Sequence, residues 1–200
     1  MPLEKFKELY ALAEKGDSSA QYNLGVLFAK SDDGASRSRT AKQAIDWWKK
    51  AAAQGHSLAK YNLGHCYSSG DLVATNGKEA VRWFKLAAED AMPQAQFALG
   101  LLYQQGRLVE RDMEQALHWY LEASRQGFPQ AIFNLADIYS QKGEYYDLAK
   151  AFKFFYIALA FGDENAAPRL KALGLEMTEE QIRQAQQEAQ AVLASAKRDS

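Results

Sequence analysis

Apolar side chains follow one another along this chain in two alternating patterns, both with the spacing of helices. The first pattern runs through Ala59, Leu63 and Cys66, at intervals of three and four residues that fit the 3.6-residue period of an α-helix. The second begins at Ala80 and Trp83 and has the same period. The two patterns together predict a hairpin of two helices, here called helix A and helix B.

This hairpin pattern occurs four times along the chain. Each helix A carries an aromatic residue, then a small or amide residue, leucine, and glycine or alanine. The four copies lie 36 to 39 residues apart, at Tyr22 to Gly25, Tyr61 to Gly64, Phe97 to Gly100 and Phe133 to Ala136. Each helix B carries an aromatic residue four positions before an alanine, at Trp47, Trp83, Trp119 and Phe154. A period of this length predicts stacked helical hairpins, and therefore an all-α solenoid.

The repeats divide the whole chain, 1–200, into one predicted domain. An N-terminal capping helix is expected at 3–15, the repeats at 16–54, 55–90, 91–126 and 127–161, and a partial repeat with a C-terminal capping helix at 162–200. The last helix is predicted to start at Thr178, because Thr178 and Gln181 have the spacing of a capping box. At the front, Leu9, Leu12 and Ala13 occupy the register of the apolar face of a helix B.

Local signals set the ends of the helices and their packing. Gly70 is expected to close the second helix A, and Thr75 or Asn76 to cap the helix B that follows. Residues 31–40, where the first repeat is three residues longer, are predicted to form an exposed loop. The glycine that recurs at one register of helix A is interpreted as making room for an opposing aromatic ring, since glycine inside a helix costs about 1 kcal/mol. It occupies Gly25, Gly64 and Gly100.

The repeated motif resembles the Sel-1-like repeat, a relative of the tetratricopeptide repeat. Residues 59–67 match the first half of the family pattern, A-x-x-x-L-G-x-x-Y, and residues 116–127 match nearly all of the second half. The resemblance implies a right-handed superhelix whose A helices line a concave surface, and a non-catalytic adaptor that assembles other proteins. One branch of the family ties each hairpin with a cysteine pair and binds penicillin-like compounds. This chain has the single cysteine Cys66, so that property is not expected here.

The same resemblance indicates which side chains face the groove. The expected binding surface consists of Tyr22, Asn23, Val26, Tyr61, Asn62, His65, Phe97, Ala98, Leu101, Phe133, Asn134 and Asp137. Asparagine can grasp peptide amides and aromatic rings supply rigid apolar contact, a combination typical of binding surfaces. Residues that every repeat shares can equally serve the stacking of the hairpins. Positions that differ between repeats are therefore the stronger specificity candidates: His65, Leu101, Gln104, Gln105 and Asp137.

Composition narrows the functional classes further. The formal net charge is −1 and the cations are spread among carboxylates, so nucleic acid is not an expected partner. The three histidines lack the spacing of a zinc site and no glycine-rich phosphate loop is present, so neither metal nor cofactor is expected. Cys66 aligns with apolar residues of the other repeats and is interpreted as a core residue. The sequence predicts no membrane span or signal peptide and hence a cytoplasmic protein, although a trimmed leader stays possible.

Three functional hypotheses follow. The leading one is a non-catalytic scaffold that presents its groove to a peptide or protein. The second is a structural subunit that self-associates, for which Tyr145 and Tyr146 are a candidate contact. The third is an enzyme, which would require ionisable groups that converge in one pocket, and the sequence indicates no such group.

Overall fold

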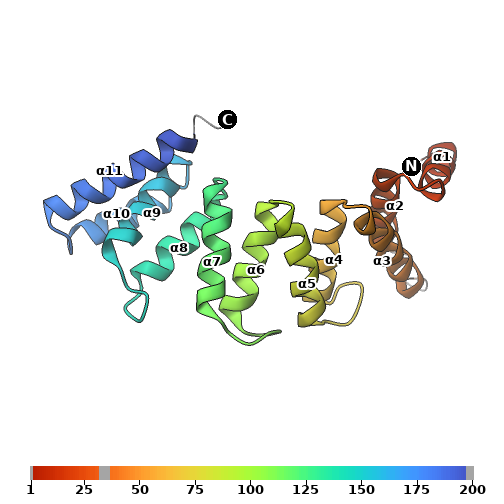
Figure 1. Cartoon of the computed structure of the whole chain (residues 1–200), viewed down its shortest axis with the longest axis horizontal. Coiled ribbons are helices and arrows are strands. Elements are labelled where there is room, and N and C mark those ends of the chain that lie inside the picture. Colours follow the sequence, from red (N-terminus) through yellow and green to blue (C-terminus); the bar gives the residue numbers. More distant parts are fainter. Residues whose placement is uncertain (1, 32–36, 197–200) are drawn as a thin grey trace. The chain divides into compact units, whose positions relative to one another are not determined.

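The structure, a computed structural model, describes residues 2–31 and 37–196. Within these ranges every regular element is helical, and there are eleven helices (Figure 1). One compact unit, Met1–Arg111, holds α1 (Leu3–Glu14), α2 (Ser18–Lys30), α3 (Arg37–Ala53), α4 (Ser57–Ser69), α5 (Gly77–Glu89) and α6 (Pro93–Gln105). The other, Asp112–Ser200, holds α7 (Met113–Arg125), α8 (Pro129–Ser140), α9 (Leu148–Ala160), α10 (Ala166–Gly174) and α11 (Glu179–Ala196).

Neighbouring helices pair within each unit. In the first unit every helix from α1 to α6 packs against the next one along the chain. In the second unit α8 packs between α7 and α9 in sequence order, and both α10 and α11 pack against α9. The helices contact in the order of the sequence, which is the arrangement of stacked hairpins. The predicted all-α fold is confirmed.

Three of the B helices begin with the same side-chain cap. Asn76, Asp112 and Asp147 each accept a hydrogen bond from the backbone N–H three residues later, at 3.2, 2.9 and 3.0 Å. These caps satisfy one of the N–H groups that lack a partner in the first turn of a helix. Of the two candidates for the second repeat, Asn76 and not Thr75 is the cap. Gly70 closes α4 in the expected left-handed conformation, with a φ of 81°.

The loop predicted at residues 31–40 is wrong in its second half. Helix α3 already begins at Arg37, and residues 32–36 lie outside the described part of the chain. In the first repeat, Thr40 occupies the position equivalent to Asn76 and Asp112. Its hydroxyl donates a hydrogen bond to the carbonyl of Ser31 at 3.5 Å. Helix α3 therefore extends about one turn further toward the N-terminus than this register predicts.

A glycine and an aromatic ring lock each of the first two hairpins. A Cβ placed on Gly25 would come within 2.4 Å of the Trp48 ring, and one on Gly64 within 2.6 Å of the Phe84 ring. Both rings are almost fully buried. The interpretation of these two glycines as seats for an opposing ring is therefore confirmed. The ring comes from the residue directly after the recurring tryptophan of helix B.

One alanine takes the place of a glycine at the end of a helix B. Ala91 has a φ of 57°, the left-handed conformation that Gly55 and Gly127 adopt at the same register of their repeats. A side chain in this conformation costs about 1 to 2 kcal/mol. The turn that follows α5 is therefore more strained than its counterparts.

Buried glutamines tie helices of neighbouring hairpins together. The Gln21 amide, which is 5% exposed, donates to the carbonyl of Ala13 at 3.0 Å and accepts a hydrogen bond from Gln54 at 2.8 Å. At the same register Gln96 donates to the carbonyl of Ala88 at 3.5 Å. A buried amide without partners would cost free energy, so these bonds fix the approach of α2 to the end of α1 and of α6 to the end of α5.

The two end caps differ. Thr178 and Gln181 form the predicted capping box, because the backbone N–H of each is bound by the side chain of the other, at 2.9 and 3.3 Å. At the front, Ala13 is buried as expected, but Leu12 is 51% exposed. The expectation that Leu12 is buried like Ala51 is wrong, because Ala51 packs between two neighbouring hairpins and α1 contacts one.

Candidate functional site

A hollow between α4 and α6 is the candidate site. Its volume is about 640 Å³, and it opens on the side of the unit where these two A helices lie. It is called the α4–α6 hollow below. The residues that line it are Tyr61, His65, Ser68, Ser69, Thr75, Phe84, Gln94, Phe97, Ala98, Leu101, Leu102, Gln105, Arg107 and Leu108. Volumes of this size are typical of ligand sites.

The hollow brings together several of the predicted groove residues from two successive repeats. Tyr61 and His65 come from α4, while Phe97, Leu101 and Gln105 come from α6. His65 is exposed and Leu101 is half-buried, so both can be contacted from solvent. Gln104 is half-buried and does not line the hollow. Of the positions that differ between repeats, His65, Leu101 and Gln105 therefore share one surface.

The aromatic residues of the motif pack against helix B as well as facing solvent. The rings of Tyr61 and Phe84 lie 5.6 Å apart, and burial raises the pKa of the Tyr61 hydroxyl. The rings of Phe133 and Phe155 meet edge to face at 5.4 Å. Such ring pairs stabilise a core beyond the area that they bury. These aromatics therefore have a packing role, with part of each surface left open.

Tyr22 and the asparagines of the motif occupy different environments. Tyr22 stacks on the His56 ring at 4.6 Å, and Asn23 is exposed. Asn62 lines a separate hollow of about 410 Å³ that also includes His65. Asn134 is hydrogen-bonded to the fully buried Tyr120 hydroxyl. The motif asparagine thus supports the core in the fourth repeat and lies beside a hollow in the second.

Asp137 is engaged by neighbouring side chains of its own unit. One carboxylate oxygen lies 3.8 Å from the Arg169 guanidinium, and the other accepts a hydrogen bond from Gln141 at 2.7 Å. A partner that binds Asp137 has to compete with both groups. Asp137 is not part of the lining of the α4–α6 hollow, and within its own unit it is linked to α10 and the end of α8.

Part of the α4–α6 hollow comes from a segment that the sequence analysis did not single out. Arg107 and Leu108 lie in the connection after α6, outside any helix. The segment is held close to α5, because a Cβ on Gly77 would come within 2.0 Å of the Leu108 carbonyl oxygen. The sequence does contain a sign of this close approach, because a glycine, Gly77, directly follows the helix cap Asn76. That Leu108 is the residue opposite Gly77 can be known only from the packing of the folded chain.

The charge of the hollow is one-sided. Its described lining includes the Arg107 guanidinium and the His65 imidazole but no carboxylate. Seven of its side chains are aromatic or aliphatic: Tyr61, Phe84, Phe97, Ala98, Leu101, Leu102 and Leu108. An apolar floor with a cation at its edge suits an apolar side chain that has an acidic neighbour.

Cys66 has the environment of a core residue. It is 5% exposed, and burial, together with the nearby Asp71 carboxylate as the smaller cause, raises the pKa of its thiol to about 11. Because the reactive form of cysteine is the thiolate, this environment opposes nucleophilic chemistry. The interpretation of Cys66 as a core residue is confirmed.

The raised pKa of Cys66 predicts a loss of stability in alkaline solution. Between about pH 9 and 11 the unfolded chain loses the thiol proton while the folded chain keeps it, so folding becomes less favourable as pH rises. The slope from one such group is at most about 1.4 kcal/mol per pH unit. Urea unfolding across this range measures it. Cys66→Ala is expected to have a shallower slope, and an equal slope in both proteins would contradict this environment for the thiol.

Two further searches concern the described residues alone. Across residues 2–31 and 37–196, no three His, Cys, Asp or Glu side chains come together in a way that could hold a metal ion. No helix in the same part of the chain combines the length and the apolar character needed to cross a bilayer.

Comparison with known families finds four successive matches to the Sel1 repeat, at residues 18–56, 57–91, 93–128 and 129–160. The chain belongs to the Sel1 repeat family. Sel1 repeat proteins typically act as protein-interaction scaffolds and are generally non-catalytic. The resemblance that the sequence motif indicated is confirmed.

Two solved structures of Sel1 repeat type are similar to this chain. One is c5321, a protective antigen present in uropathogenic Escherichia coli strains that displays an SLR fold, with 32% identity and a TM-score of 0.76 over 97% of this chain. This chain spans 41% of the length of that structure. The other is a Sel1 repeat protein from Oxalobacter formigenes, with 29% identity and a TM-score of 0.70, covering 92% of this chain and 75% of that one. No curated protein gives a significant match.

Proposed function

We propose that this Sel1 repeat protein is a non-catalytic scaffold that binds a segment of a partner protein in the α4–α6 hollow. The observation that carries the proposal is the convergence of His65, Leu101 and Gln105 on one open hollow with an apolar floor. These residues vary between repeats, so packing that every hairpin shares does not account for them. The family supports a protein as the partner.

The chemistry of the hollow favours a particular kind of segment. An apolar side chain of the partner would lie on Phe97 and Leu101, and an acidic group beside it would meet Arg107. Apolar contact supplies most of the affinity at such sites, while the charge selects among partners. The remaining groove candidates Tyr22, Asn23, Asn62, Phe133, Asn134 and Asp137 are proposed as flanking contacts.

The test introduces a charge into the floor of the hollow. Leu101→Glu is expected to weaken capture of the partner at least tenfold, because a carboxylate without a partner would be buried against apolar groups. Affinity capture from the cells that produce the protein, read by mass spectrometry, measures the loss. The circular-dichroism melt should stay within a few degrees of the parent, because Leu101 is half-exposed.

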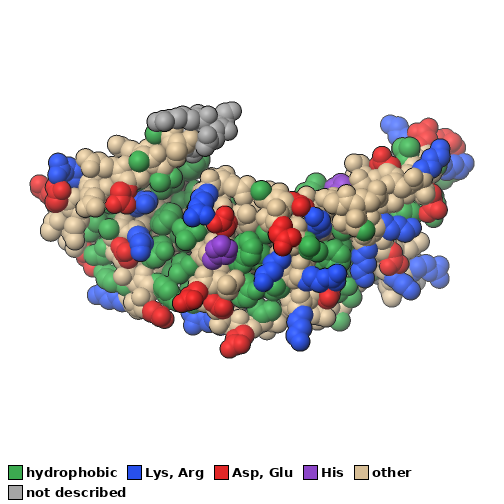
Figure 2. All heavy atoms as spheres, in the orientation of Figure 1, with side chains coloured by type: hydrophobic (Ala, Val, Ile, Leu, Met, Phe, Trp, Pro, Cys, Tyr) green, Lys and Arg blue, Asp and Glu red, His purple; other side chains and the backbone are tan. Residues whose placement is uncertain are grey.

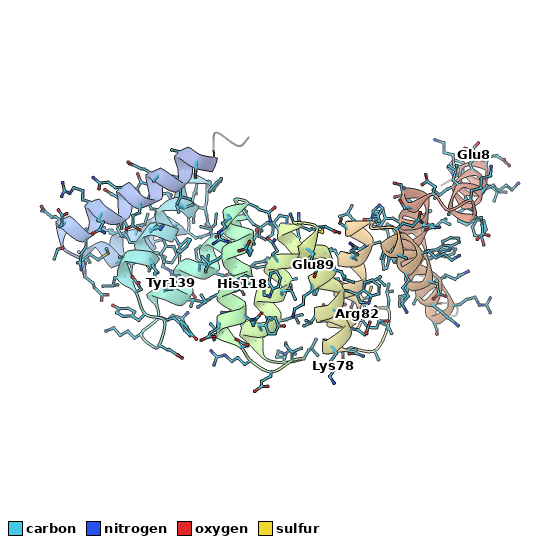
Figure 3. All side chains as sticks on the ribbon, in the orientation of Figure 1. Glu8, Lys78, Arg82, Glu89, His118 and Tyr139 are labelled. Carbon is cyan, nitrogen blue, oxygen red and sulfur yellow. The ribbon has the colours of Figure 1, made fainter. Side chains whose placement is uncertain are left out.

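Lys78→Glu is the matched control. Lys78 is an exposed residue of α5 that does not line the hollow, and the variant introduces the same carboxylate (Figure 3). It is expected to capture the same partners as the parent. Equal capture by all three proteins would contradict the proposed site, and equal loss in both variants would show a nonspecific effect of charge.

A further inference from the structure

A second hollow lies in the other unit, and none of the predicted groove residues belongs to it. It has a volume of about 450 Å³ and is formed by the end of α7, the start of α8, and α9 and α11, which pack against each other (Figure 1). It is called the α9–α11 hollow below. Its lining consists of Leu121, Ser124, Arg125, Gly127, Ile132, Lys153, Phe154, Ile157, Phe161, Val192, Leu193 and Ser195.

The floor of the α9–α11 hollow is apolar, and large apolar side chains also lie exposed at its edge. Ile132 and Ile157 are 1% and 3% exposed, so they lie deep in the unit. Phe161 and Val192 are large apolar side chains that remain 44% and 40% exposed. The Phe161 ring lies beside Gly127, 3.4 Å from the position that a Cβ would take there. Large apolar side chains left open around an apolar depression are typical of binding sites.

The polar hydrogens of the lining serines are already used. The Ser124 hydroxyl donates to the carbonyl of Leu121, and the Ser195 hydroxyl donates to the carbonyl of Val192, both at 2.8 Å. They therefore give a ligand no free donor in these conformations. The donors left for a ligand are the charged groups of Arg125 and Lys153.

These two cations make the hollow complementary to an anion. No carboxylate belongs to its described lining. Arg125 is paired with Glu122 on its own helix, and Lys153 lies 3.2 Å from Glu188, whose side chain is 51% exposed. Both ion pairs are partly open to solvent, where such pairs contribute little to stability, so a ligand carboxylate can replace Glu122 or Glu188 at small cost.

We propose that the α9–α11 hollow binds a single-chain anionic amphiphile of the fatty-acid class. The carboxylate pairs with Arg125 and Lys153, and the alkyl chain lies on Ile157, Phe161 and Val192. A neutral apolar ligand would make no use of the two cations, which would stay paired with Glu122 and Glu188, and a strongly polar anion would leave the apolar floor uncovered. A hollow of this size holds a small molecule with most of its surface buried.

Calorimetric titration of the full chain with sodium decanoate tests the site, below the concentration at which decanoate forms micelles. Saturable binding is expected, with affinity that rises about fourfold for each methylene added from octanoate to decanoate. Decanol, which lacks the charge, should bind at least tenfold more weakly, and Arg125→Gln with Lys153→Gln should remove that difference.

Two matched pairs of variants locate the ligand. Val192→Glu places a like charge at the edge of the hollow and should abolish decanoate binding, whereas Ala194→Glu on the exposed side of α11 should not. Lys150→Gln breaks a similar ion pair on α9 outside the hollow and should leave affinity unchanged. No saturable binding, equal affinity for decanol and decanoate, or affinity indifferent to Arg125, Lys153 and Val192 would each overturn the proposal.

Discussion

Gly64→Leu is expected to unfold the hairpin of α4 and α5. The Cβ alone would lie 2.6 to 2.8 Å from three atoms of the Phe84 ring, and that ring is 2% exposed with Tyr61 packed beside it. Overpacking by small additions costs about 1 to 3 kcal/mol, and leucine adds three further carbons. We therefore expect a loss of more than about 3 kcal/mol in the free energy of unfolding, measured by urea titration.

Two comparisons separate this clash from a general effect of replacing glycine. Gly143→Leu is the control, because a Cβ at Gly143 meets nothing within 4 Å, and it should change the free energy of unfolding by less than about 0.5 kcal/mol. Gly64→Ala should be destabilising although alanine favours helices, and combining it with Phe84→Leu should recover part of the loss. A Gly64→Leu protein that melts like the parent would contradict the interpretation that Gly64 makes room for the Phe84 ring.

Gly77→Ala is expected to be the second large effect. The added Cβ would lie 2.0 Å from the carbonyl oxygen of Leu108 and 2.6 Å from its carbonyl carbon. Both are backbone atoms, so no side-chain rotation relieves the clash. The connection after α6 has to move, at a cost of about 3 kcal/mol in the free energy of unfolding. Hydrogen exchange of the amides in residues 106–111 should accelerate.

The same variant connects the fold to the proposed function. Because Arg107 and Leu108 line the α4–α6 hollow, their displacement should weaken capture of the partner even where the protein stays folded. Lys78→Ala, one residue further into α5 and exposed, is the control and should behave like the parent. Unchanged exchange of residues 106–111 in Gly77→Ala would contradict the close approach of the two segments.

The repeat explains which parts of this fold the sequence could predict. A glycine that returns at one register indicates a large group opposite it, so the role of Gly25 and Gly64 was accessible from the pattern. The end cap at Thr178 and Gln181 was also accessible, because its hydrogen bonds join residues three positions apart. Both features depend on local spacing, which a sequence displays directly.

Other features depend on groups that are far apart in the chain or absent from the repeat. Helix α3 begins at Arg37, before the register of Thr40, and nothing in the spacing of apolar residues revealed this earlier start. Repetition also could not distinguish the role of Asn134, which bonds to the buried Tyr120, from that of Asn62 beside a hollow. The pairing of Asp137 with Arg169 required the position of α10, which is not a copy of any repeat.

The charges show the same limit. The net charge of −1 gives no hint of where unlike charges separate. Cations nevertheless gather on the solvent side of α3 and α5 in Figure 2, including Lys78 and Arg82. The absence of carboxylates from the lining of the α4–α6 hollow, with Arg107 at its edge, likewise follows only from the way that α4, α6 and the connection after α6 pack together.

Site-specific photo-crosslinking tests the central claim, that the α4–α6 hollow holds a segment of a partner protein, most directly. A benzophenone amino acid is placed at Leu101, inside the hollow, and in a parallel protein at Lys78 on the solvent side of α5. After irradiation of the producing cells, the account predicts a discrete adduct with another protein from position 101 and none from position 78. The same adduct from position 78, or none from position 101 in a folded protein, would contradict it.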